Sequence, residues 1–89
     1  MKAVLTVIGN DSVGIIAGIS SVLANDNVNI IDINQTIMSG MFTMVMIIEM
    51  NESESDFSTI NDKLVKKGKE LGVQVIVTRE EIYKSMHRI

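Results

Sequence analysis

Two stretches of this chain share one local plan, and this internal repetition restricts the folds that are open to it. Each stretch passes from a helical pattern through a polar or glycine turn into Val-x-(Ile/Val): "LANDNVNIIDI" begins at Leu23 and "KELGVQVIVTR" begins at Lys69. A strand pattern precedes each helix, so the predicted order is β-α-β-β-α-β. A right-handed crossover makes the two strands of each β-α-β unit parallel, which gives one four-stranded antiparallel sheet with both helices on one face. The sequence therefore predicts an α+β, ferredoxin-like fold.

The spacing of the apolar residues sets approximate bounds for these elements. Short β-branched runs predict strands over residues 2–8, 28–38, 41–50 and 73–78. Apolar residues at helical spacing predict a first helix from about Gly14 to residues 25–27. Ser39 and Gly40 predict a two-residue hairpin turn between the second and third strands, because glycine tolerates positive φ.

The second helix carries its own start and stop signals. Ser53 and Asp56 resemble a capping box in which Asp replaces the usual Glu, and Gly72 predicts the C-cap. Gly68 stands among the inward positions, so we expect close approach of the helix to the sheet there. The inward side chains are predicted to be Phe57, Ile60, Leu64 and Leu71.

The hairpin presents more apolar surface than two helices on one face would cover. Alternation in its first strand places Ile31, Ile33, Gln35 and Ile37 on one face and Ile30, Asp32, Asn34, Thr36 and Met38 on the other. Its second strand is apolar on both faces, although the uncovered face of such a sheet should be polar. Five of the seven methionines lie in this hairpin: Met38, Met41, Met44, Met46 and Met50.

Two interpretations explain this apolar hairpin. In the first, the tail over residues 79–89 forms a short helix, with Ile82, Tyr83, Met86 and Ile89 on one stripe, and covers the open face within the same chain. In the second, a partner subunit covers it, because large apolar patches usually mark interfaces and methionine packs adaptably. An unpaired edge strand would also favour extension of the sheet across a two-fold axis.

Composition excludes several classes of protein. The formal net charge of −3 argues against a nucleic-acid binder, and the four clustered lysines have the spacing of a solvated helix face: Lys63, Lys66, Lys67 and Lys69. Without cysteine there is no disulfide framework and no thiolate metal site. The chain has neither a signal-peptide pattern nor an apolar run of roughly twenty residues, so we expect a cytoplasmic protein without a membrane span.

The turn "GNDSVG" between the first strand and the first helix is richer in special residues than a plain turn requires. A helix that begins at Val13 or Gly14 presents free N–H groups and the positive end of its dipole, which attract a carboxylate or a phosphate. Gly14 would let a ligand approach the backbone closely. The alternative is that Asp11 or Ser12 simply caps the helix. The glycines of this turn match neither of the common nucleotide-binding spacings.

Asp11-x-x-Gly14-Ile15, followed by the helix and by "NVNIIDINQT" from Asn27, resembles the ACT domain family over nearly the whole chain. Within it, the chain is similar to small stand-alone ACT proteins like the glycine cleavage system transcriptional repressor. The resemblance implies a single ACT domain over residues 1–89 and a regulatory module that binds an amino acid or related metabolite between subunits. Carried over, the ligand-binding residues are Asn10, Asp11, Ser12, Val13, Gly14, Ile15, Asn29 and Ile30.

Nothing in the chain resembles a catalytic constellation. The single histidine, His87, lies in the charged tail, and the first turn lacks the arginine on which an acylphosphatase of this fold relies. Exposed aromatics for stacking RNA bases are missing from the central strands. We therefore expect no catalysis, no cofactor and no metal, and a homodimer or tetramer that acts on an unknown downstream protein. The alternative is a protein-docking module without a small ligand, which binds through the Met-rich sheet face.

Overall fold

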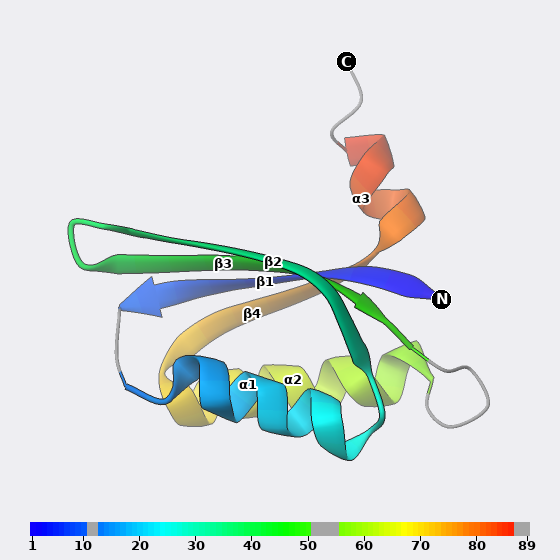
Figure 1. The fold of residues 1–89 in the computed structure, drawn as a ribbon, viewed down its shortest axis with the longest axis horizontal. Coiled ribbons are helices and arrows are strands. Elements are labelled where there is room, and N and C mark those ends of the chain that lie inside the picture. The colour runs from blue at the N-terminus through cyan, green and yellow to red at the C-terminus, as the bar shows by residue number, and fades with distance from the viewer. Residues whose placement is uncertain (11–12, 51–55, 87–89) are drawn as a thin grey trace.

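The computed structural model describes residues 1–10, 13–50 and 56–86. Along the chain these form β1 (Lys2–Asn10), α1 (Ile15–Asn25), β2 (Asn29–Met38), β3 (Met41–Glu49), α2 (Phe57–Leu71), β4 (Val73–Arg79) and α3 (Glu80–Met86). The strands lie in the order β2-β3-β1-β4, and each neighbouring pair is antiparallel. Figure 1 shows α1 and α2 together on one side of the sheet. The predicted ferredoxin-like fold is confirmed, and the strand bounds differ from the predicted ones by at most two residues.

The core lies between the sheet and the two helices. Alternation along the central strands β1 and β3 directs Leu5, Val7 and Met44 toward the helices, and each of these side chains is 0% exposed. The helices contribute Ile15, Ile19, Leu23, Ile60 and Leu64 to the same cluster. The described residues include no buried polar or charged side chain. Burial of apolar surface, about 25 cal/mol per Å², therefore holds α1 and α2 against the sheet.

The methionines of the hairpin divide between the core and the surface, which corrects the predicted Met-rich exposed face. Met44 and Met46 are 0% exposed on the helix side of β3, and Met50 is 2% exposed. Only Met38 and Met41, at the turn end of the hairpin, remain largely exposed. The open face of β3 instead carries three half-buried side chains, Thr43, Val45 and Ile47.

A β-bulge in β2 changes which of its side chains share a face. Ile30 and Asp32 pair with adjacent residues of β3, so Ile31 is the extra residue of the bulge. Because of this insertion Ile30 faces the helices, and the predicted placement of Ile30 with Asp32 on the opposite face is wrong. The alternation after the bulge is confirmed: three side chains lie opposite buried residues of β3 and share their face, namely Ile33, Gln35 and Ile37.

The connection between β2 and β3 is the predicted two-residue turn. Ser39 has φ 52° and Gly40 has φ 78°, and two successive positive φ values are typical of a type I′ turn. This turn matches the right-handed twist of the strands, so Met38 and Met41 pair directly on either side of it.

The first turn of α2 is capped by Asp56. Its Oδ1 accepts a hydrogen bond of 2.8 Å from the Thr59 N–H, so Asp56 is the N-cap and the predicted capping box, which placed it one turn inside the helix, is wrong. Ser53 lies outside the described residues. The hydrogen bond from the Thr59 backbone lowers the pKa of the Asp56 carboxyl from 3.8. At the other end, Gly72 has φ 76°, which confirms the predicted C-cap.

Protonation of Asp56 is expected to weaken α2 at low pH. Because the pKa is lowered in the folded state, the contribution of the carboxylate to stability is complete above about pH 4. It is lost as the pH falls through the folded pKa. Asp56→Asn should keep the cap, since Asn caps about as well as Asp, and should remove this part of the pH dependence. Urea unfolding of both proteins at pH 7 and pH 3 measures the difference, and an identical loss of stability in both would contradict it.

The C-terminal helix α3 leaves the sheet instead of folding back over it. Figure 1 shows α3 rising on the side of the sheet opposite α1 and α2. None of its residues is buried, and Ile82 and Met86 are 50% and 65% exposed. The predicted short helix is confirmed. It packs against β1 and β4 at one end of the sheet, so the described part of the tail covers the open face only at that end. Ile89, the last member of the predicted stripe, lies outside the described residues.

Candidate functional site

The helix α1 begins at an N-cap residue that has no side chain, Gly14. Gly14 occupies the N-cap position with φ 94°, a left-handed conformation that glycine adopts without strain, and it has no side chain to act as a cap. The alternative that Asp11 or Ser12 caps the helix falls on residues that lie outside the described ones. The first intrahelical hydrogen bond runs from Gly18 N–H to Gly14 C=O, 2.8 Å. The N–H groups of the preceding turn, residues 15–17, receive no side-chain acceptor from any described residue.

These N–H groups adjoin a cavity of about 290 Å³ between the start of α1 and the turn end of the hairpin. It is lined by Gly14, Ile15, Ile16, Ala17, Gln35, Ile37 and Phe42. Phe42 is 3% exposed and belongs to the core, whereas Ile16 and Ile37 are 38% and 59% exposed. The cavity therefore combines an apolar lining with main-chain donors and one side-chain amide, which is the usual composition of a small-ligand site.

Gln35 is the site residue that was absent from the predicted set. It lies on the helix-facing side of β2 opposite Met44, between Ile33 and Ile37 on the same face. Its amide offers both a donor and an acceptor to the cavity. The signal in the sequence was the one polar residue in an otherwise apolar alternation. Its neighbour across space, the first turn of α1, is eighteen to twenty residues earlier in the chain.

Asn29 and Ile30 lie at the opposite end of the sheet from this cavity. Asn29 pairs with Glu49, whereas Asn10 pairs with Met41, eight residues away along β3. At about 3.3 Å per residue this separates the two ends by about 26 Å. A single chain therefore brings Gly14 and Ile15 to the cavity, leaves Val13 fully exposed beside it, and keeps Asn29 and Ile30 away from it.

The sheet has one long unpaired edge beside the cavity. β2 is ten residues long and, among the described strands, pairs only with β3, so its outer N–H and C=O groups have no partner in the described sheet. Ile33 and Ile37, on its helix-facing side, are 42% and 59% exposed. A long apolar edge of this kind favours pairing with another strand.

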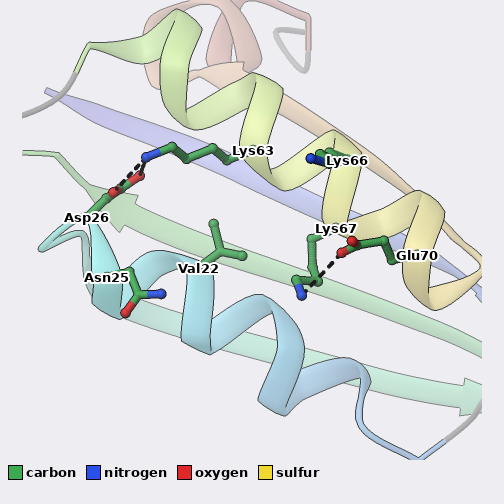
Figure 2. A pocket seen from close by; sticks show the side chains of 7 residues that line it. All are labelled: Val22, Asn25, Asp26, Lys63, Lys66, Lys67 and Glu70. Carbon is green, nitrogen blue, oxygen red and sulfur yellow. Dashed lines mark hydrogen bonds and ion pairs between the residues drawn. The ribbon is translucent and has the colours of Figure 1, made fainter.

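A second concavity, also of about 290 Å³, lies between α1 and α2 (Figure 2). Four of its five charged side chains, all but Lys66, form ion pairs within the chain. Lys63 Nζ lies 3.0 Å from both carboxylate oxygens of Asp26, and Lys67 Nζ lies 3.2 Å from Glu70 Oε2. Figure 2 shows the Lys63–Asp26 pair bridging the end of α1 to α2. This groove is explained as an inter-helix contact, whose exposed ion pairs contribute about 0–1 kcal/mol each.

The described residues hold neither a cluster able to bind a metal ion nor a helix able to span a membrane. Across residues 1–10, 13–50 and 56–86, no group of three or more His, Cys, Asp or Glu side chains could hold a metal ion. In the same part of the chain, no helix is long and apolar enough to cross a membrane.

A βαββαβ sheet with two helices on one face defines the ferredoxin-like class of folds, and in this chain a cavity lies at the N-terminus of the first helix. Residues 2–78 match the ACT domain model, and the chain belongs to the ACT domain family, whose members are regulatory modules that bind small ligands. The resemblance seen in the sequence is confirmed.

The relatives agree with this assignment. The chain is 53% identical over 88 residues to a UPF0237 protein of Methanocaldococcus jannaschii, which covers 99% of this chain and 98% of the relative. It is 34% identical to the solved ACT domain protein from Streptococcus pneumoniae, with a TM-score of 0.81 and 93% of each chain covered. A structure named for a glycine cleavage system transcriptional repressor shares the fold at 22% identity, with a TM-score of 0.77, 86% of this chain covered and 44% of that one.

Proposed function

We propose that residues 1–89 form one non-catalytic ACT domain that senses an amino acid or a related small metabolite in the cytoplasm, as a homo-oligomer. The observation that carries the proposal is the cavity between the bare N-terminus of α1 and Gln35. Membership of the ACT family supports a regulatory role, and the lining of the cavity supports binding of an amino acid.

The parts of this cavity match the parts of an amino acid. A carboxylate fits the N–H groups of residues 15–17, where the positive end of the helix dipole adds to the attraction. The Gln35 carbonyl and the Asp11 carboxylate, the latter outside the described residues, would accept hydrogen bonds from the ammonium group. Ile37 and Phe42 offer an apolar lining for the ligand side chain. Because unpaired buried polar groups are costly, such a site would reject ligands that lack either charge.

Pairing of two β2 edges would complete the predicted set of ligand-binding residues. In an antiparallel pair centred on β2, the Asn29 end of one strand lies beside the Met38 end of the other. Gln35 and Ile37 line the cavity near that end. The pairing would therefore bring Asn29 and Ile30 of a second copy to the cavity of the first, which bridges the separation of about 26 Å within one chain.

A thermal-shift screen against the twenty amino acids and a few related small metabolites at millimolar concentration tests the proposal. A ligand at about a hundred times its dissociation constant adds roughly 2.7 kcal/mol and raises the melting temperature by on the order of ten degrees. Gln35→Leu and Asn29→Ala should reduce or abolish the shift. Asn34→Ala is the matched control, since Asn34 neighbours Gln35 in β2 but lies on the opposite face.

The outcomes of this screen separate sensing from simple docking. A shift that survives in Asn34→Ala and is lost in Gln35→Leu supports a ligand in this cavity. If no amino acid or related metabolite shifts the melting temperature, the sensing proposal is wrong. The chain is then better explained as a protein-docking module.

A further inference from the structure

The face of the sheet opposite α1 and α2 is an uncharged apolar surface over three of its strands. On β1, β3 and β4 the outward side chains are Val4, Thr6, Ile8, Thr43, Val45, Ile47, Gln74, Ile76 and Thr78. Ile76, in the middle of β4, is 44% exposed. The polar and charged outward residues lie at the margin, with Asp32 on the edge strand and Lys2 and Glu49 at one end. An apolar centre with a polar rim is the composition of a protein interface.

α3 stands beside this open face as a second apolar surface. It packs against β1 and β4, at the end of the sheet where β4 runs directly into it, and rises away from the sheet (Figure 1). Val4, the outward residue of β1 that pairs with Thr78 at this end, is only 4% exposed. Ile82 and Met86 lie four residues apart on one side of α3 and are 50% and 65% exposed. Contacts within the described part of the chain leave these two side chains exposed, and neither of them lines the cavity at the N-terminus of α1.

We propose that the open face and α3 together bind a second copy of this chain, sheet to sheet about a two-fold axis. The length of α3 matches the spacing of two packed sheets. Seven helical residues are about 10 Å long, and two sheets that pack face to face lie about 10 Å apart. Each α3 would therefore span the gap and reach the partner sheet, so that the two helices close opposite ends of one apolar layer.

The extent and the charge of the surface both favour a second copy as its occupant. The three apolar strands, spaced about 4.8 Å apart and about eight residues long, cover on the order of 400 Å² per copy. Two such faces bury on the order of 800 Å², and the exposed sides of the two α3 helices bring the total to about 1,000 Å², the lower bound of a specific interface. The centre of the face offers no charge to select a charged partner, whereas a second copy matches it in polarity.

This surface is separate from the β2 edge on which the proposed function depends. If both act, the assembly is a tetramer with two kinds of two-fold interface, because edge pairing leaves the open face free. If only the open face acts, the assembly is a dimer. The two proposals can therefore fail independently.

Sedimentation velocity of the intact protein at micromolar concentration tests the interface. The double variant Ile82→Asp, Met86→Asp and the single variant Ile76→Lys should each halve the sedimenting mass, since charge would be placed in the apolar layer. No residue of α3 is buried, so the double variant should keep the circular dichroism spectrum of the native protein. Ser21→Asp, on the exposed surface of α1, is the matched control and should keep the native mass.

Each result decides for or against the face-to-face interface. A tetramer that becomes a dimer, or a dimer that becomes a monomer, in both open-face variants supports it. A monomeric native protein, or a native mass in both variants, overturns it. Ile33→Lys places a charge at the β2 edge and should disrupt only the edge contact. Its effect on the sedimenting mass therefore tests the proposed function and leaves the open-face result unchanged.

Discussion

Replacing Met46 by alanine is expected to destabilise the protein by about 2–5 kcal/mol. Met46 is 0% exposed in the middle of β3, where it lies between Leu5 of β1 and Ile33 of β2. Truncation removes most of the buried side chain and leaves a cavity that the surrounding strands and helices cannot fill. A domain of this size has about 5–15 kcal/mol of stability in total, so a large part of it would be lost. Urea unfolding followed by circular dichroism measures the change.

Two variants control this experiment. Met46→Leu conserves most of the volume and should cost less than about 1.5 kcal/mol. Met41→Ala, in the same strand but 46% exposed at the turn, should change stability by about 0.5 kcal/mol or less. Equal losses in Met41→Ala and Met46→Ala would show that the two methionines share one environment, contrary to the division described above.

Gly68→Val is expected to cost about 2 kcal/mol, although valine is a better helix former than glycine. A Cβ on Gly68 would lie 2.5 Å from Val75 Cγ2 and 3.1 Å from the Val73 carbonyl oxygen. The carbonyl oxygen belongs to the backbone of β4 and cannot rotate away, so α2 itself must move outward. This confirms the close approach that was predicted from the glycine. The loss should appear as a lower urea midpoint with an unchanged slope.

Lys66→Val is the matched control for this prediction. Lys66 is an exposed residue of the same helix, so the same new side chain there should change stability by about 0.5 kcal/mol or less. If Gly68→Val proved as stable as Lys66→Val, α2 would have room to shift and the contact with β4 would not limit residue 68.

The fold could be predicted because its signals act over short distances. Alternation marked the strands, helical spacing marked α1 and α2, and Gly72 and the Ser39–Gly40 pair marked a cap and a turn through their backbone preferences. The predictions were wrong where the local sequence was compatible with more than one arrangement. Asp56 itself, not a residue three positions earlier, captures the free N–H of Thr59. A single inserted residue at Ile31 reversed the face of Ile30, and alternation alone cannot reveal a bulge.

Only part of the candidate site could be predicted from the sequence. The turn before α1 was found because its residue types are unusual in one place, and Gly14 does adopt the left-handed conformation that only glycine accepts freely. Gln35 was noticed as an exception to its apolar face, but its position beside the first turn of α1 depends on how the hairpin lies across the helix. The separation of Asn29 from the turn likewise follows from strand pairing, and this is what makes a second copy necessary to the proposed site.

By itself the sequence determined the order of the elements, their class and the family to which the chain belongs, because each depends on residue type and spacing along the chain. Tertiary structure alone decided which face of the hairpin is buried, where Gln35 and Asn29 lie, and that α3 covers only one end of the open face. The physical reason is that these features depend on contacts between residues far apart in the chain, and a local pattern leaves such contacts undetermined.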